Sequence, residues 1–336
     1  MKKVLCFGEI LLRVSPFMKG LDQDPFAIYV GGAEANVARA LAGFGVDVQY
    51  SSAMPDNFMA TRILQYLNDR SVGTNKMIIK GERIGIYYLD QGADLKGAVV
   101  YDRAGSSFAN LLPGSIDWDQ FFEGVDWFNF SAITPAINQN LAGLCLEAVK
   151  VATTKNIKVS IDLNYRSRLW KYTSNPIEVM EKLLPFCNLV MGNIWSANTL
   201  LGIKIDEAIH SKKSKQAYLD QAMDVSKQIM DRYPVCELVA NTFRFDQNDN
   251  QILYYSSLYN RTESFQSPEF NIDQIIDKSG SGDCFMAGLI SGILQENQPQ
   301  QILNFATAAA VGKLQEMGDG TRQNVRSVNE LLQKYQ

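Results

Sequence analysis

Histidine is almost absent from this chain, because the only one among its 336 residues is His210. A catalytic triad that depends on histidine, or a metal centre made of several histidines, is therefore excluded. His210 lies in the polar stretch 208–215, which favours a solvated loop or the end of a helix.

Cysteine is also sparse and has no regular spacing. The five residues are scattered, odd in number and mostly inside apolar runs, without the paired spacing of a zinc site or a redox motif. We expect buried, reduced thiols. Cys284 follows an acidic residue at a predicted helix start, and we favour a packing role for it over a nucleophilic one.

The chain has no excess of positive charge and no long apolar run. Its 32 Lys and Arg residues face 36 Asp and Glu residues, with a pI near 5.3. Neither nucleic acid nor an anionic membrane is expected as a partner.

The apolar run after Met1 is too short for a signal peptide, and no segment approaches a membrane span. We expect a cytoplasmic protein that binds anions through specific clusters.

Apolar runs and amphipathic segments alternate along much of the chain. With 46% apolar residues, one α/β domain with an accessory element is as compatible with the length as two domains. Buried strands are predicted at 4–7, continuing through 8–16, and at 76–79, 127–130, 158–162, 189–192 and 238–241. Helices are predicted at 31–44, 58–70, 139–155, 177–184, 217–232, 283–294, 300–316 and 327–336. This alternation predicts a mostly parallel sheet covered on both faces, with ligands beyond the carboxyl ends of its strands.

One region has a different pattern. Segments 83–90 and 98–103 are rich in β-branched and aromatic residues and are separated by the turn-like segment 91–97. They predict a hairpin. Together with part of 13–33, this hairpin is expected to form a small sheet that projects from the core.

The most informative stretch is Asp-Lys-Ser-Gly-Ser-Gly-Asp at 277–283, directly before an apolar helix. Gly280 and Gly282 let the backbone turn tightly and direct several N–H groups at one anion, and the helix start adds further donors. The simpler interpretation is that Ser281 or Asp283 only caps the helix. A dinucleotide fingerprint is excluded because Phe285 stands where its third glycine is required, and a Walker loop is excluded because Gly-Asp-Cys replaces Gly-Lys-Ser/Thr.

A carboxylate beside a bound phosphate is electrostatically unfavourable, because two negative charges repel, so we expect it to have a function. The function that fits is that Asp283 accepts the proton of a hydroxyl that attacks this phosphate. The stretch 277–283 resembles the carboxy-terminal signature of ribokinase-like (PfkB) sugar kinases, Asp-Thr-x-Gly-Ala-Gly-Asp, with Lys278 in place of Thr. The resemblance implies that Gly280, Ser281 and Gly282 form the anion hole and that Asp283 is the catalytic base.

The resemblance spans nearly the whole chain, with motifs in the family's order. It implies a ribokinase-like three-layer α/β/α sandwich with a mostly parallel central sheet and a small β-sheet lid over the sugar. The expected core comprises 1–12, 34–81 and 109–336, and the expected lid 13–33 and 82–108. ATP and Mg²⁺ are the implied cofactors, and a lid excludes water from phosphoryl transfer. An exposed lid edge favours a homo-oligomer, a dimer or larger.

Two further motifs concern the substrate. The pattern Gly-Gly-x-x-x-Asn at 31–36 is either a simple connection into a helix or, as the resemblance implies, a sugar site in which Gly32 and Asn36 contact hydroxyls. Tyr101 and Arg103 alternate along a strand, so they share a face. This pair is either an aromatic ring packed under an exposed arginine or a fork for a carboxylate.

The pattern Tyr-x-Arg-x-Gly-Ser at 101–106 resembles that of 2-keto-3-deoxygluconate kinases, whose substrate carries a carboxylate. By this resemblance, Tyr87, Tyr101 and Arg103 contact the sugar acid. Arg166, in Asp-x-Asn-x-Arg at 162–166, is assigned to the carboxylate or to the transferring phosphate, whereas Arg168 and Trp170 are expected to be structural.

Two segments depart from the family pattern. After the strand at 189–192 the family has Asn-x-x-Glu, whose glutamate helps to organise Mg²⁺, but here Asn193 is followed by Ser196. The metal ligands are therefore not assigned. The segment 242–244 lacks the expected glycine. Asn193 and Arg244 are assigned to nucleotide binding together with Gly280 and Gly282, although Arg244 is equally compatible with a solvated position.

The sequence thus predicts ATP-dependent phosphorylation of 2-keto-3-deoxygluconate at its terminal hydroxyl. One alternative is a kinase for a neutral sugar such as fructose, in which Arg103 contacts a hydroxyl or nothing. Another is a kinase-like binding protein with weakened catalysis, which the departures at 193–196 and 242–244 favour and the intact Asp283 opposes. The sequence does not separate gluconate from galactonate stereochemistry.

Overall fold

The computed structural model describes residues 2–16, 26–89, 99–173, 175–212, 214–248 and 251–335. Six parallel strands form most of the central sheet, in the order β4 (Asp47–Ser51), β1 (Lys3–Phe7), β9 (Trp127–Ser131), β10 (Lys158–Asp162), β11 (Leu189–Gly192) and β12 (Leu238–Asn248). Three antiparallel strands complete it: β13 (Gln251–Tyr259), β14 (Ser264–Gln266) and β15 (Phe270–Ile272). This arrangement confirms the predicted mostly parallel sheet.

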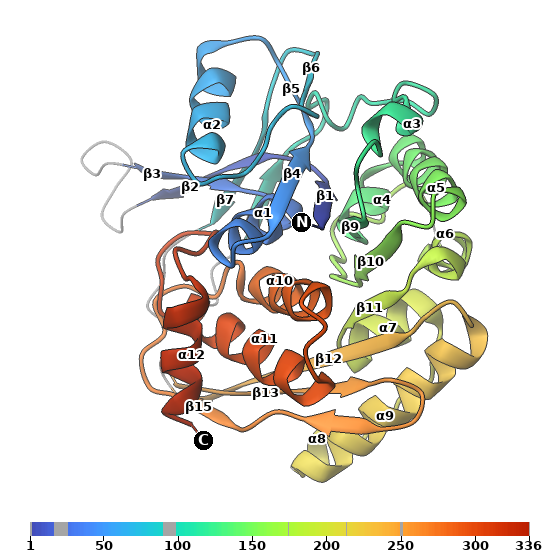
Figure 1. The fold of residues 1–336 in the computed structure, drawn as a ribbon, viewed down its shortest axis with the longest axis vertical. Coiled ribbons are helices and arrows are strands. Elements are labelled where there is room, and N and C mark those ends of the chain that lie inside the picture. Colours follow the sequence, from blue (N-terminus) through green and yellow to red (C-terminus); the bar gives the residue numbers. More distant parts are fainter. Residues whose placement is uncertain are drawn as a thin grey trace.

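Successive side chains of a strand point to opposite faces of a sheet, and β1 shows the consequence. Leu5 and Phe7 belong to one apolar core, whereas Val4 and Cys6 belong to the other. The first core is covered by α5 (Gln139–Thr154), α6 (Pro176–Leu183), α7 (Ile194–Leu201) and α9 (Lys215–Arg232). The second is covered by α1 (Ala33–Gly43), α2 (Phe58–Asn68), α10 (Ser281–Leu294), α11 (Pro299–Leu314) and α12 (Val325–Gln333) (Figure 1). The three-layer prediction is confirmed.

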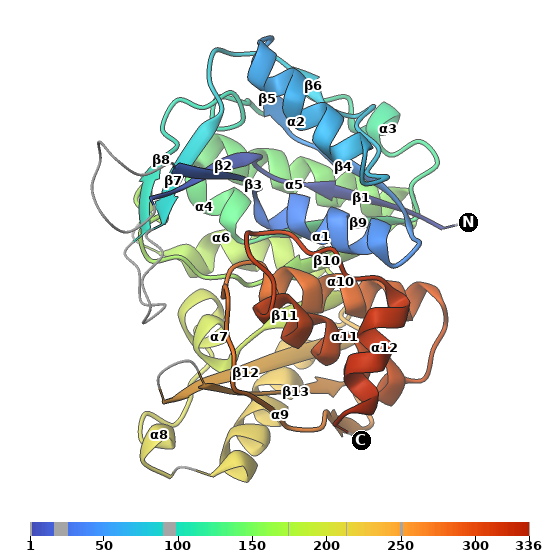
Figure 2. The ribbon, with the colours of Figure 1, turned by 90° about the vertical axis from the view of Figure 1, so that its left-hand side faces the viewer.

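A second sheet of four strands is separate from the central one (Figure 2). Its order is β3 (Phe26–Gly31), β2 (Leu11–Pro16), β7 (Gly85–Leu89) and β8 (Val99–Asp102). Strands β7 and β8 are antiparallel, with Tyr87 opposite Tyr101, which confirms the predicted hairpin. We call these four strands the lid sheet. The predicted turn at 91–97 and residues 17–25 of the predicted lid lie outside the described residues.

Three strand predictions need correction. The segment 8–16 does not continue the central sheet: the Gly8 N–H still bonds to Ser51, but the Ile10 N–H bonds to the Ser52 hydroxyl, and β2 then joins the lid sheet. The predicted strand 76–79 is reduced to β6 (Ile78–Ile79), which pairs with β5 (Ala53–Met54). Strand β12 extends beyond residue 241, because its second half pairs with β13 rather than with a parallel neighbour.

The predicted helices lie close to their expected bounds, but some short helices were not predicted: α3 (Trp118–Phe121), α4 (Ile133–Ile137), α8 (Ile209–Lys212) and a 3₁₀ turn (Leu184–Phe186).

His210 lies in the last turn of α8, stacked on Trp195 with ring centroids 5.3 Å apart, as expected of a helix-end residue. All five cysteines are buried and free of disulfide bonds, which confirms the prediction of buried, reduced thiols. Within the described part of the chain, no helix is long and apolar enough to cross a membrane.

Candidate active site

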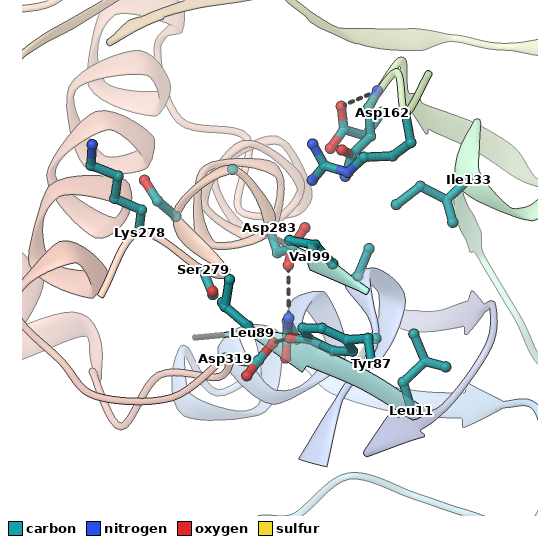
Figure 3. A pocket seen from close by; sticks show the side chains of 18 of the residues that line it. Leu11, Tyr87, Leu89, Val99, Ile133, Asp162, Lys278, Ser279, Asp283 and Asp319 are labelled. Atoms are coloured by element: carbon teal, nitrogen blue, oxygen red, sulfur yellow. Dashed lines mark hydrogen bonds between the residues drawn. The ribbon is translucent and has the colours of Figure 1, made fainter. Parts of the chain in front are cut away.

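A cavity of about 1220 Å³ lies where the lid sheet faces the carboxyl ends of β10, β11 and β12 (Figure 3). Pockets for a single small ligand usually have volumes of about 300–1,000 Å³, so this one has room for two small molecules. Every site residue predicted from the sequence lines this cavity. They are Gly32, Asn36, Tyr87, Tyr101, Arg103, Arg166, Asn193, Arg244, Gly280, Ser281, Gly282 and Asp283.

The glycine turn begins α10 with a backbone shape that only glycine adopts easily. Gly280 is the N-cap, with φ of 78°, and a Cβ built on it would lie 1.8 Å from the carbonyl oxygen of Asp319. No side chain of the described residues caps the helix, so the N–H groups of its first turn are left for a ligand. The Ser281 hydroxyl donates to the Ala310 carbonyl at 3.0 Å, so the donor that Ser281 can offer the cavity is its backbone N–H. Gly280 to Gly282 thus provide an uncapped helix N-terminus, which is suited to a phosphate.

Asp283 lies in the first turn of α10 and is buried at the cavity wall. Asn36 on α1 donates its Nδ2 hydrogen to Asp283 Oδ2 at 2.8 Å. Burial raises the pKa of Asp283 to about 8. The Asn36 hydrogen bond and the charge of Arg166 oppose this rise in pKa, whereas Asp162 and Glu34 add to it. A carboxyl with this pKa is well matched to accepting a proton near neutral pH.

Asn36 also has an unused acceptor. Its Oδ1 is buried and has no hydrogen-bond partner among the described residues. Next to it, Gly32 caps α1 with φ of 121°, and a Cβ there would lie 2.4 Å from the Glu9 carbonyl oxygen. Both residues line the cavity. A ligand hydroxyl that donates to Oδ1 would satisfy this buried atom, which otherwise costs free energy.

Two other carboxyl groups of the cavity wall, those of Asp162 and Glu34, add to the rise in the pKa of Asp283. Burial raises the pKa of Asp162 to about 6, although the Asn164 N–H and the charge of Arg166 favour its ionised form. Burial raises the pKa of Glu34 to about 7, against hydrogen bonds from the N–H and hydroxyl of Ser131 at 2.8 and 2.6 Å. Among the described residues, no group of three or more His, Cys, Asp or Glu is arranged to hold a metal ion. A Mg²⁺ ion here would therefore depend on ligands from a phosphate, as is usual for this ion.

Two arginines expose unpaired guanidinium groups to the cavity. Arg166, after β10, and Arg244, on β12, are exposed, and neither side chain has a hydrogen bond or ion pair within the described ranges. By contrast, Lys278 is paired with Asp246, its Nζ lying 2.8 Å from Oδ1. Arg168 donates to the carbonyl of Val99 in the lid sheet, in keeping with its predicted structural role. Arg166 and Arg244 are thus available to an anionic ligand.

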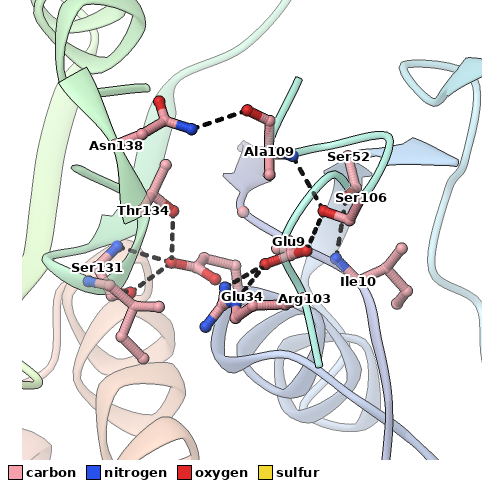
Figure 4. Close-up of polar contacts among 12 residues, drawn as sticks. Glu9, Ile10, Glu34, Ser52, Arg103, Ser106, Ala109, Ser131, Thr134 and Asn138 are labelled. Carbon is pink, nitrogen blue, oxygen red and sulfur yellow. Dashed lines mark hydrogen bonds and ion pairs between the residues drawn. The ribbon is translucent and has the colours of Figure 1, made fainter. Parts of the chain in front are cut away.

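Arg103 is held differently from the free fork expected from the sequence. Its Nε and Nη2 both donate to Oε2 of Glu9, the Nε bond being 2.7 Å long, and the other oxygen of Glu9 accepts a hydrogen bond from Ser106 (Figure 4). The two hydrogens of Nη1 and the second hydrogen of Nη2 remain for a ligand. The prediction that Arg103 shares a face with Tyr101 holds, since its Cζ lies 5.8 Å from the ring centroid.

Two tyrosines of the lid sheet, Tyr87 and Tyr101, line the cavity. The rings of Tyr87 and Tyr101 are 6.3 Å apart between centroids. The Tyr87 hydroxyl donates to Oδ1 of Asp319, so in this structure it has a protein partner rather than being free for a substrate.

Residues 1–229 and 250–325 match the family model described as pfkB family carbohydrate kinase. The chain belongs to this family. A crystal structure of 2-dehydro-3-deoxygluconokinase from Thermotoga maritima superposes on this pfkB kinase with a TM-score of 0.90 and 32% identity, covering 99% of this chain and 100% of the other. The 2-dehydro-3-deoxygalactonokinase of Haloferax volcanii is 25% identical, over 94% of this chain and 92% of its own. A fructokinase from Xylella fastidiosa, solved with bound ATP, shares the fold at 20% identity, with a TM-score of 0.77 and coverage of 99% and 98%.

The departure at 193–196 in this pfkB kinase has a local structural explanation. Asn193 Oδ1 accepts the Ser196 N–H at 2.8 Å, and the Ser196 hydroxyl accepts the Asn193 N–H at 3.0 Å. This reciprocal pair is a capping box that begins α7. At the position where the family pattern has a glutamate, Ser196 thus caps a helix. The side chain of Asn193, which we assigned to nucleotide binding, has the same capping role.

Sequence reasoning missed four charged residues of the cavity wall in this kinase: Glu9, Arg13, Glu34 and Asp319. Glu34 stands inside the glycine and asparagine motif at 31–36, and Asp319 lies between Gly318 and Gly320. An acidic residue between two glycines was the signal that could have found Asp319, and an acidic residue inside a glycine and asparagine motif was the signal for Glu34. Glu9 follows Gly8 directly and so carried the same kind of signal, whereas nothing near Arg13 in the sequence indicates its distant partners.

Proposed function

We propose that this pfkB kinase phosphorylates the terminal hydroxyl of 2-keto-3-deoxygluconate with ATP as donor. The hydroxyl oxygen forms a bond to the γ-phosphorus, the bond from that phosphorus to the β,γ-bridging oxygen breaks, and ADP leaves. Asp283 takes the hydroxyl proton. The observation that carries this proposal is the juxtaposition of Asp283, an uncapped glycine turn and an unpaired arginine in one cavity.

The chain's residues fit ATP without an all-protein metal cage. The first-turn N–H groups of α10 would hold the transferring phosphoryl group, and Arg244 would pair with a phosphate of the nucleotide. Mg²⁺ bound with ATP neutralises part of the charge on the phosphate oxygens. Asp162 would be suited to assist that ion, since its pKa of about 6 leaves it largely ionised at neutral pH.

The preference for a sugar acid follows from the distribution of charge in the cavity. A carboxylate would pair with Arg166, which has no protein partner in the described structure, and with Nη1 of Arg103. Glu9 holds the Arg103 guanidinium in a fixed orientation, so less entropy is lost when a carboxylate binds. Tyr101 and Asn36 Oδ1 would contact the sugar chain. Two of the relatives named above are a 2-dehydro-3-deoxygluconokinase and a 2-dehydro-3-deoxygalactonokinase. Their names support a sugar acid as the class of substrate.

Replacing Arg166 with Gln is expected to raise KM for 2-keto-3-deoxygluconate by about ten- to a hundredfold. The reason is that a hydrogen bond to a charged group contributes about 1.5–3 kcal/mol. Turnover of fructose, if measurable, should change little. Steady-state kinetics with both sugars would test this, with Arg244→Gln as the matched variant, for which KM for ATP should rise instead. An equal loss of kcat on both sugars would contradict the carboxylate assignment and place Arg166 on the transferring phosphate.

A pH profile tests Asp283 as the base. Only the ionised carboxyl accepts a proton, so kcat/KM should rise with pH and level off above the pKa of about 8. Asn36→Leu removes a hydrogen bond that favours the ionised form, so the rising limb should move to higher pH in that variant. Measuring kcat/KM from about pH 6 to pH 10 in both proteins would show the shift. A limb at the same pH in both would be inconsistent with Asp283 as its origin.

A further inference from the structure

The lid sheet is tied to the core by a buried charged network next to the glycine turn. Arg13 on β2 and Tyr87 on β7 stand opposite each other in the parallel pairing of these strands. Arg13 Nη1 donates to Asp277 Oδ2 at 2.6 Å and to Asp319 Oδ2 at 3.3 Å. Tyr87 donates to the other oxygen of Asp319. Two adjacent lid strands therefore converge on one core carboxylate.

The same network shapes the turn that would hold the phosphoryl group. Arg13 also donates to the Ser279 hydroxyl at 3.2 Å, and Asp277 Oδ1 accepts the Ser279 N–H at 2.9 Å. The backbone carbonyl of Asp319 lies so close to Gly280 that no side chain fits between them. Asp319 thus contacts the lid through its carboxylate and the turn through its backbone. Figure 3 shows Asp319, Ser279 and Tyr87 together at this side of the cavity.

The network also reaches the segment expected to contact the sugar. A Cβ built on Gly31 would lie 3.1 Å from Asp319 Oδ1 and 3.2 Å from the Tyr87 ring. Gly31 is the last residue of β3 and precedes Gly32, the cap of α1. A ligand that presses on the lid wall or on the 31–32 segment therefore acts on groups that hold the turn.

Stability alone is a poor reason for such an arrangement. Arg13 is only 2% exposed, and the two carboxylates beside it are almost as deeply buried. Removing these charges from water has a cost that their attraction often only balances, so a buried ion pair is weak evidence for stability. Its geometric effect is clearer, because each hydrogen bond fixes the lid and the turn relative to each other.

We propose that Asp319 is a positioning residue that couples the lid sheet to the glycine turn, so that closure of the lid over a sugar acid sets the turn for phosphoryl transfer. Arg13 and Tyr87 are the lid partners in this coupling, and Asp277 is its second anchor. The sugar-dependent part of this inference rests on the proposed function. The mechanical link between lid and turn does not, and it can be measured in the protein without ligand.

Hydrogen exchange of the ligand-free protein, followed by mass spectrometry, tests the link with Asp319→Asn, Tyr87→Phe and the double variant. Peptides that cover 277–283 should exchange about tenfold faster or more in each single variant, although Tyr87 lies in the lid sheet and not in these peptides. The double variant should exchange little faster than the singles, because both act through one contact. Tyr88→Phe is the matched control: Tyr88 is the next residue of β7, is 41% exposed, and should leave the turn unchanged.

Faster exchange confined to the lid peptides in Tyr87→Phe, with the turn as in the wild type, would overturn the coupling. If Asp319→Asn does not fold, Tyr87→Phe alone decides between these results. Kinetics give a second readout: Tyr87→Phe should lower kcat about tenfold and raise KM for the sugar, whereas a purely structural anchor would lower stability without changing kcat. If no sugar acid is turned over by the wild type but Tyr87→Phe still loosens the turn, the proposed function fails and the link stands.

Discussion

Asp283→Asn is expected to lower kcat by about a hundred- to ten-thousandfold, the range typical of losing a general base. The amide cannot accept the hydroxyl proton, but it keeps the size of the side chain and an oxygen that can accept from Asn36. Binding of the sugar acid, measured by calorimetry, should therefore stay close to that of the wild type. Asp246→Asn, which neutralises an exposed carboxylate paired with Lys278, is the control and should keep most of the activity.

The same variant should change stability in a direction that depends on pH. Burial raises the pKa of Asp283 from 3.8 to about 8, so its carboxyl favours the folded state while it is protonated. That contribution is fully present below 3.8 and is lost as pH rises through about 8. Above about pH 8, Asp283→Asn should melt at a higher temperature than the wild type, and the difference should shrink at lower pH. Retained turnover, or a variant that is less stable at high pH, would argue against this description of Asp283.

Gly280→Ala should have the second large effect, with kcat lowered by about a hundred- to a thousandfold, as when an oxyanion donor is lost. Gly280 has φ of 78°, and a Cβ there would meet the backbone of Asp319 at 1.8 Å, which no side-chain rotation relieves. The turn must shift, and with it the N–H groups directed at the phosphoryl group. Steady-state kinetics and a thermal melt would separate lost catalysis from lost folding.

Gly282→Ala is the matched control for this prediction. It adds the same methyl group two residues along, where the nearest atom is the terminal carbon of Met191, at 3.7 Å. That is an ordinary contact, and φ of Gly282 is not in the left-handed region. Its kcat should fall far less than that of Gly280→Ala. Equal losses in the two variants would mean that turn geometry is not the reason for the glycine at 280.

The sequence predicted the parts of the site that depend on short-range patterns. The glycine turn at 277–283 and the apolar alternation of the strands are local features, and the structure has both where they were expected. The lid sheet was predicted as well, because its strands have a composition of their own. These successes share a cause, since each pattern is set by backbone conformation or by which face of an element is buried.

Pairings between distant residues were not predictable in the same way. Glu9 and Arg103 are 94 residues apart, and Arg13 and Asp319 are 306 apart, so nothing near either residue indicates its partner. This is why Arg103 was expected as a free fork and Asp319 was not expected at all. The Ser196 departure was similarly ambiguous until the capping box of α7 showed what the serine does.

The most direct test of the proposed function is coupled ADP release by the wild type with ATP and Mg²⁺ over four sugars: 2-keto-3-deoxygluconate, 2-keto-3-deoxygalactonate, fructose and ribose. The cavity, in which Arg166 has no partner among the described residues and Arg103 is oriented by Glu9, predicts turnover of the acids and little or none of the neutral sugars. Turnover of fructose or ribose alone would contradict the assignment of Arg103 and Arg166 to a substrate carboxylate. The protein would still act as a carbohydrate kinase. Binding of the acids without any ADP release would contradict the role proposed for Asp283.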